Sequence, residues 1–182
     1  MNNLSQNFKL ILSEISDVQV DSIALQKLLS AIQEVDAIFL DGRGRSGLVA
    51  KMFANRLSHL GLKPHVIGEV SCPPIQTGDL YLIISGSGNS SALLENLRRV
   101  HKLGGKTAVV TTNTNSKLAQ ETDISVLIPT DTKFSKERTS KQPMGALFEQ
   151  TAFITLETAV LSLAQTLGRD ENFMEAHHAN IE

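Results

Sequence analysis

Cysteine, unbalanced charge and long apolar runs are all scarce in this sequence, and each scarcity excludes a class of protein. The 182 residues include one cysteine, Cys72, which excludes an internal disulfide and a zinc site built from several cysteines. The formal net charge of −2 gives no reason to expect nucleic acid or a membrane surface as a partner. No apolar run reaches membrane-spanning length and residues 1–9 lack an apolar signal core, so we expect a cytoplasmic protein.

The residues that are present describe a folded chain in which strands and helices alternate. With 41% hydrophobic and 20% charged residues, the composition argues against disorder. Buried strands are predicted at residues 37–40, 65–68, 80–84, 107–110 and 124–128. Helices are predicted at residues 4–15, 23–32, 47–60, 92–103 and 116–120. This alternation indicates a five-stranded parallel sheet between two helical layers, an α/β three-layer α-β-α sandwich of flavodoxin- or Rossmann-like type.

Two glycine-rich loops each follow a predicted strand and precede a predicted helix. Residues 41–47 read DGRGRSG and residues 85–90 read SGSGNS. Backbone N–H groups, hydroxyls and a helix N-terminus converge in such a loop, which suits a phosphate. No lysine follows the glycines of the serine loop, so it is not a GxxxxGK[ST] nucleotide loop. Either loop alone is also explained by tight packing, but together they predict a small phosphorylated ligand. The predicted binding residues are Gly44, Arg45, Ser46, Ser85, Gly86, Ser87 and Ser90.

The last third of the chain contains a long polar segment and then a long apolar one. Residues 130–141 have no periodicity, which is typical of a functional lid or a disordered loop. Pro143 is predicted to lie in the first turn of a long helix that Gly168 ends. Residues 144–167 are apolar nearly all round, so we expect burial in the core or between subunits. A final short helix is predicted to carry Phe173, Met174, His177 and His178.

The pairing of Gly-Arg-Ser-Gly after the first strand with Ser-Gly-Ser-Gly-x-Ser after the third resembles the sugar isomerase (SIS) domain family. Three further stretches resemble the 6-phospho-3-hexuloisomerases within it: residues 42–53 (GRGRSGLVAKMF), 142–150 (QPMGALFEQ) and 178–182 (HANIE). The resemblance extends from about residue 40 to the last residue. It implies one SIS domain over residues 1–182, with helices 4–34 and a helical tail 170–182 as additions, and a homotetramer.

This resemblance also implies an activity. The hexuloisomerases interconvert D-arabino-3-hexulose 6-phosphate and fructose 6-phosphate through a 2,3-enediol(ate), in the ribulose monophosphate pathway of formaldehyde fixation. A hexulose-6-phosphate synthase is then the implied functional partner, and neither a metal nor another cofactor is implied. Two alternatives stay open: a non-catalytic sugar-phosphate sensor, and an SIS isomerase of another sugar phosphate.

The resemblance assigns two catalytic residues. Glu149 matches the glutamate of the family's FEQ stretch and is the candidate base; from its helical position alone, an ordinary surface carboxylate is equally plausible. His178 matches the histidine of the family's ending, where an imidazole can shuttle protons near neutral pH. His177 stands where related proteins have arginine, so no phosphate contact is assigned to it. A tail this near the end of the chain would reach a site only if held, for example by a neighbouring subunit.

Overall fold

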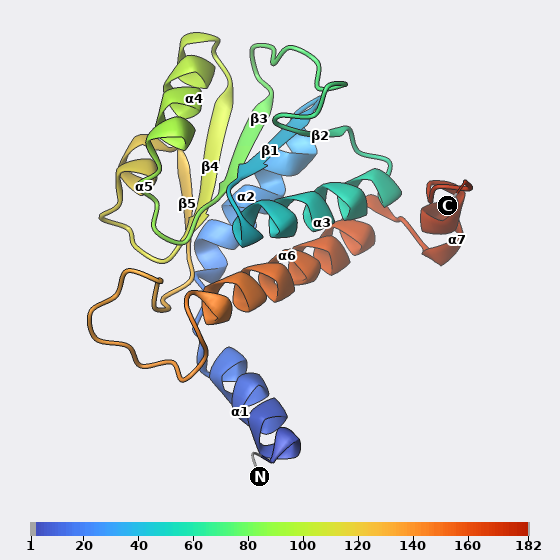
Figure 1. Cartoon of the computed structure of the whole chain (residues 1–182). Coiled ribbons are helices and arrows are strands. Elements are labelled where there is room, and N and C mark those ends of the chain that lie inside the picture. Colours follow the sequence, from blue (N-terminus) through green and yellow to red (C-terminus); the bar gives the residue numbers. More distant parts are fainter. Residues whose placement is uncertain (1–2, 182) are drawn as a thin grey trace.

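The computed structural model describes residues 3–181 and contains one five-stranded parallel sheet (Figure 1). The strand order is β2-β1-β3-β4-β5, the flavodoxin-like order. The predicted fold class is therefore confirmed. The strands are β1 (Ile38–Gly42), β2 (Pro64–Val66), β3 (Leu80–Ile84), β4 (Lys106–Thr111) and β5 (Ile124–Leu127).

Helices cover both faces of the sheet because side chains alternate along each strand (Figure 1). Leu40 and Leu82 face one hydrophobic core, whereas Phe39 and Tyr81 face the other. The helices on the Leu40 side are α2 (Ser22–Glu34), α3 (Arg45–His59) and α6 (Ala146–Leu167). Those on the Phe39 side are α4 (Ser91–Lys102) and α5 (Lys117–Glu121).

The first and last helices lie outside this sandwich. In Figure 1, α1 (Leu4–Asp17) and α7 (Glu171–Ala176) project from the body in different directions. Neither helix contains a buried residue. Among residues 3–181, no helix combines the length and hydrophobicity that a membrane span requires.

Two predictions about the C-terminal third need correction. The long helix begins at Ala146, so Pro143 lies before it and not in its first turn. Met144 has φ 57°, which a right-handed helix does not permit, and the Pro143 carbonyl accepts the Ala146 N–H in a turn. Gly168 ends the helix as predicted, at φ 63°.

The second correction concerns the histidine pair. The final helix carries Phe173 and Met174 but ends at Ala176, so His177 is its C-cap and His178 lies beyond it. The 178–182 stretch includes residue 182, which lies outside the described residues.

Candidate active site

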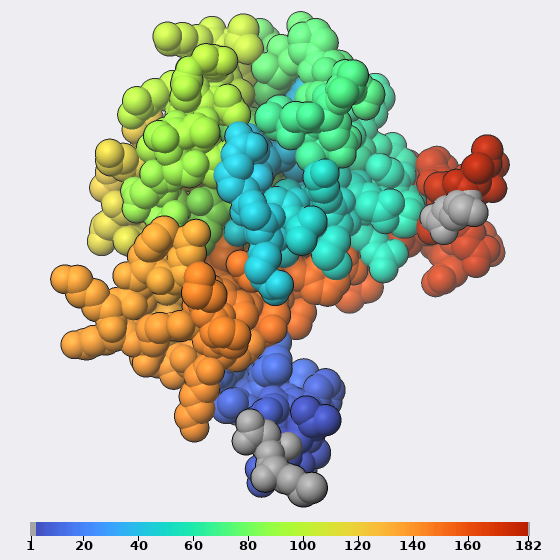
Figure 2. Space-filling model, in the orientation of Figure 1, coloured from blue at the N-terminus to red at the C-terminus, as the bar shows by residue number. Residues whose placement is uncertain are grey.

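A cavity of about 660 Å³ lies at the carboxyl ends of β1 and β3, where ligands of this fold class bind. The strand order reverses between β1 and β3: the chain leaves β1 toward β2 on one side and leaves β3 toward β4 on the other side. In Figure 2, the cyan segment after β1, the yellow-green α4 region and the orange segment before α6 meet on one face. Seven predicted binding residues and Glu149 line this cavity: Gly44, Arg45, Ser46, Ser85, Gly86, Ser87, Ser90 and Glu149.

Neighbouring segments hold the backbone of the serine loop, residues 85–90. The Thr112 hydroxyl after β4 donates a hydrogen bond to the Gly86 carbonyl at 2.9 Å. The Asn89 side chain joins the loop to α5, since its amide donates to a carbonyl within the loop at 2.9 Å and its oxygen accepts the Lys117 N–H at 3.1 Å. The loop is thus preorganised before any ligand binds.

The serine hydroxyls of this loop have different tasks. Ser85 is buried, and its oxygen accepts the Gly88 N–H at 3.3 Å. Ser90 is the N-cap of α4, yet its side chain makes no capping hydrogen bond. Ser87 and Ser90 line the cavity at the N-terminus of this helix, where the dipole and unpaired N–H groups favour an anion.

Two glycines of the serine loop lie where a side chain would crowd its neighbours. Gly88 has φ 62°, and a Cβ there would lie 2.1 Å from the Ser116 hydroxyl oxygen. A Cβ on Gly86 would lie 3.0 Å from the ring of Phe148 on α6. The glycines therefore let the loop pack against α5 and α6 and still leave its N–H groups accessible.

A buried carboxylate supports the loop after β1. Asp41 is only 2% exposed and accepts hydrogen bonds from the Tyr81 hydroxyl (2.7 Å), the Asn96 amide (3.1 Å) and the Gly42 N–H (2.8 Å). Burial, together with this carboxylate, raises the pKa of the Tyr81 phenol far above its usual range, so Tyr81 donates as a neutral hydroxyl. The Arg43 guanidinium lies 3.7 Å from the same carboxylate, which orients it along the cavity wall.

Sequence reasoning did not anticipate this network. In the sequence Asp41 is the first residue of a glycine-rich loop, and a carboxylate directly after a predicted buried strand is a local signal that could have indicated it. Its partners Tyr81 and Asn96 lie 40 and 55 residues away in the chain, so no local pattern connects them.

The candidate base forms an ion pair with a candidate binding residue. Glu149, in the first turn of α6, accepts a hydrogen bond from Arg45, the first residue of α3. The Glu149 side chain is 18% exposed and that of Arg45 is 67% exposed. The pair uses one N–H of the guanidinium, and the arginine keeps its other donors for substrate oxygens.

His178 lies in a different cleft within this chain. This second cleft has a volume of about 350 Å³ between α3, α6 and α7. There the His178 ring lies 4.9 Å from the ring of His59, centroid to centroid. Within one subunit the structure therefore brings Glu149 to the serine loop but does not bring His178 to either.

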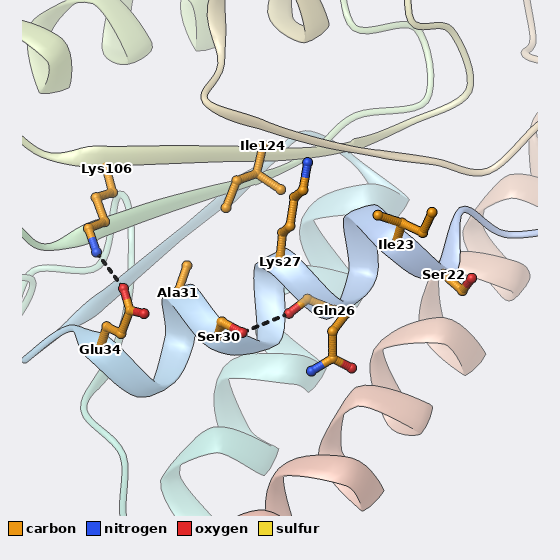
Figure 3. A pocket seen from close by; sticks show the side chains of 9 residues that line it. All are labelled: Ser22, Ile23, Gln26, Lys27, Ser30, Ala31, Glu34, Lys106 and Ile124. Atoms are coloured by element: carbon orange, nitrogen blue, oxygen red, sulfur yellow. Dashed lines mark hydrogen bonds and ion pairs between the residues drawn. The ribbon is translucent and has the colours of Figure 1, made fainter.

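A third cavity, of about 590 Å³, has no arrangement suited to catalysis (Figure 3). It runs along α2 beside the amino ends of β4 and β5, whereas the serine loop lies at the carboxyl end of β3. Its charged groups include Glu34 and Lys106, which pair with each other at 2.9 Å (Figure 3). No group of three or more His, Cys, Asp or Glu side chains in residues 3–181 is placed to hold a metal ion.

Comparisons with known proteins define the class to which this fold and cavity belong. The SIS domain family matches residues 31–156, so the chain belongs to that family. The chain is 39% identical over 170 residues to the 3-hexulose-6-phosphate isomerase of Bacillus subtilis, covering 92% of this chain and 89% of the relative. It is 36% identical over 183 residues to the enzyme of the same name from Mycobacterium gastri, covering 99% and 92%.

A solved structure agrees with these relatives. A Methanococcus jannaschii protein, for which a molecular function of 3-hexulose-6-phosphate isomerase has been inferred, superimposes with a TM-score of 0.84 at 25% identity. The match covers 97% of this chain and 99% of that one. The predicted resemblance to the SIS family and to its hexuloisomerases is therefore confirmed.

Proposed function

We propose that this protein is an isomerase that interconverts D-arabino-3-hexulose 6-phosphate and fructose 6-phosphate. One observation supports the proposal above the others: Glu149 opens into the same cavity as the serine loop. A phosphate held by the loop and a carboxylate across the cavity give a site that both binds and deprotonates one small sugar phosphate.

The phosphate would bind at the N-terminus of α4. Ser87 and Ser90 supply hydroxyl donors, and the N–H groups of the first helical turn add the positive end of the dipole. The binding energy of this group holds the reacting carbons against the base. Gly44 and Ser46, at the start of α3, provide further donors to sugar oxygens.

Glu149 would carry the proton between the two carbons. Its carboxylate removes the C2 proton, the electrons form the C2–C3 double bond, and negative charge develops on the C3 oxygen. A proton moves from the C2 oxygen to the C3 oxygen, and protonated Glu149 then delivers its proton to C3. Arg45 lies against the carboxylate and stabilises the developing oxyanion.

His178 would move the proton between the two sugar oxygens from a neighbouring subunit. Within its own chain it lies in the cleft between α3, α6 and α7, so this role requires an assembly. Exposed apolar side chains support an oligomer: Leu4, Phe8 and Leu12 of α1 are 81%, 64% and 50% exposed, and Leu161 of α6 is 67% exposed. We take the assembly to be the homotetramer that the resemblance implies.

The wider setting is also part of the proposal. Residues 1–182 would act as one domain in the cytoplasm, with α1 and the tail 170–182 serving assembly, whereas α2 packs in the core. The substrate would come from a hexulose-6-phosphate synthase in the ribulose monophosphate pathway, which joins formaldehyde to ribulose 5-phosphate.

A coupled assay tests the function. Ribulose 5-phosphate, formaldehyde and a hexulose-6-phosphate synthase are supplied, and fructose 6-phosphate is measured with and without this protein. Formation of fructose 6-phosphate that rises in proportion to the protein is expected. Tight binding of fructose 6-phosphate without any turnover would instead identify a sensor.

A further inference from the structure

The loop between β5 and α6, residues 128–145, forms one wall of the candidate active-site cavity. Residues 132–134 line the cavity from the start of the loop, and residues 144–145 line it from the end. A connection of this length without helix or strand loses much conformational entropy when it orders. What holds the loop therefore decides whether the cavity is formed.

Ties within the loop account for part of its order. The Asp131 carboxylate accepts the N–H groups of Thr139 (2.6 Å) and Ser140 (2.9 Å), which closes the segment on itself. The Arg138 guanidinium donates to the Gln142 carbonyl at 2.6 Å. These bonds fold the loop compactly but do not fasten it to the rest of the molecule.

The N-terminal helix supplies the fastening. Glu14, near the end of α1, accepts hydrogen bonds from the Ser140 hydroxyl (2.7 Å), the Lys141 N–H (2.8 Å) and the Gln142 side-chain amide (3.0 Å). Partial burial alone would raise the pKa of Glu14, but these bonds and the Lys141 charge outweigh it and lower the pKa. The carboxylate is therefore ionised at neutral pH, and three charge-assisted bonds converge on it.

We propose that Glu14 is a positioning residue for the active site: its carboxylate fastens the β5–α6 loop to α1 and so keeps the cavity wall closed. Glu14 does not line the cavity itself. The effect of Glu14 on the kinetics rests on the proposed function, whereas its effect on the order of the loop does not.

The expected effect is on the apparent affinity for substrate. If the loop is ordered in only a fraction of molecules, the apparent dissociation constant rises by the inverse of that fraction, whereas saturating substrate still orders the loop. In Glu14→Gln one carboxylate oxygen becomes an amide NH₂, so at least one of the three donors loses its acceptor, and the remaining bonds are no longer charge-assisted. We expect the KM to rise about 10-fold and the kcat to change less than about 2-fold.

The test compares Glu14→Gln with wild type by steady-state kinetics and by limited trypsin digestion. Trypsin cleaves after lysine and arginine, and the loop offers four such sites: Lys133, Lys136, Arg138 and Lys141. Mass spectrometry of the fragments measures cleavage in the loop, which does not depend on the activity. Asp17→Asn, on the same helix and without a hydrogen bond to the loop, is the matched control for loss of one negative charge.

Each outcome decides the proposal. Faster loop cleavage with a raised KM in Glu14→Gln, and neither in Asp17→Asn, supports it. Unchanged cleavage, or faster cleavage with an unchanged KM, overturns it. Ser140→Ala removes one of the bonds from the loop side and should give the same changes at smaller size. If wild type has no turnover, the proposed isomerase activity is refuted. Faster loop cleavage together with weaker fructose 6-phosphate binding in Glu14→Gln would then still support the positioning role of Glu14.

Discussion

Glu149 lies in the first turn of α6 and pairs with Arg45, the first residue of α3. The two residues are 104 positions apart in the chain. The hydrogen bond from the guanidinium holds the Glu149 carboxylate at the cavity wall. The Asp41 network does the same for Arg43, so two arginines of one loop are each oriented by a carboxylate.

Glu149→Gln should fold normally and lose turnover. An amide cannot accept the C2 proton, and proton transfer by a positioned side chain contributes about 10²–10⁴-fold to a rate. We expect the kcat to fall by that factor, with a melting temperature within a few degrees of wild type. Glu121→Gln, which removes a carboxylate paired with Arg98 on the surface, is the control and should keep the wild-type kcat. Near-normal turnover in Glu149→Gln would eliminate this residue as the base.

Ser90→Ala tests the phosphate site in isolation. Its hydroxyl makes no capping hydrogen bond, so its removal should leave α4 intact and take one donor from the bound phosphate. A hydrogen bond to a charged group contributes about 1.5–3 kcal/mol, so the dissociation constant for fructose 6-phosphate should rise at least about 10-fold. Isothermal titration calorimetry measures this constant, and the binding of inorganic phosphate should weaken by a similar factor. An unchanged constant for both ligands would place the phosphate elsewhere.

At the scale of secondary-structure elements, the site is made by loops that the sheet brings together. β1 and β3 are parallel neighbours, so the loops after them meet at their carboxyl ends, and the first turn of α6 lines the same cavity. The packing of the serine loop against α5 and α6 explains its two constrained glycines. The β5–α6 loop completes the wall, and Glu14 of α1 accepts hydrogen bonds from it.

Gly88→Ala should destabilise the fold strongly. The positive φ alone costs about 1 kcal/mol for a residue with a Cβ, and the new Cβ would overlap the Ser116 side chain at 2.1 Å. Gly78→Ala is the matched control, since Gly78 also has a positive φ (88°) but nothing lies within 4 Å of its Cβ position. Denaturant unfolding should show a loss of about 1 kcal/mol for Gly78→Ala and a clearly larger loss for Gly88→Ala. Equal losses would contradict the packing described for the serine loop.

The Glu14 contacts predict a pH dependence of stability. Because the pKa of Glu14 is lowered on folding, its contribution is complete above the unfolded value near 4.5 and is lost as the pH falls through the folded value. Glu14→Gln should therefore be less stable than wild type by about 1 kcal/mol at neutral pH, because the group is only partly buried. The difference should shrink below pH 4.5. Urea unfolding at several pH values measures it, and a difference independent of pH would argue against the ionised contact.

At the scale of the whole molecule, the active-site cavity of one chain contains only part of the proposed catalytic groups. Glu149 and the serine loop share a cavity, whereas His178 lies in the cleft beside His59. Exposed apolar side chains on α1 and α6 provide surface for the contacts that an assembly needs. The catalytic site and the assembly are therefore expected to depend on each other.

Mixing two inactive variants tests this dependence. If His178 acts across an interface, a Glu149→Gln chain and a His178→Ala chain can form a complete site where they meet. Equal mixing, followed by unfolding and refolding together, should restore about a quarter of the wild-type sites, since each site takes one residue from each of two chains. Each variant refolded alone is the control. Activity that stays at the level of the variants would place His178 outside the reaction or within one chain.

Much of the fold followed from the sequence because it depends on local patterns. Buried parallel strands are continuous apolar runs, and the five runs correspond to β1–β5 within a few residues. The start of α6 did not follow, since no residue pattern marks the positive φ of Met144 or the bonds from Arg138 to the Gln142 and Met144 carbonyls that shape the end of the loop. The final helix was predicted too long for the same kind of reason: nothing local marks its end at Ala176.

The parallel sheet, the serine loop after β3 and the family could be predicted from the sequence, because apolar runs, glycine spacing and short motifs are patterns of neighbouring residues. Three contacts required the folded structure: the pairing of Glu149 with Arg45, the hydrogen bond from Tyr81 to Asp41, and the hydrogen bonds from the β5–α6 loop to Glu14. These contacts join residues 104, 40 and 126 positions apart. The packing of the helices on the sheet brings these residues together, and the spacing of residues along the chain does not indicate it.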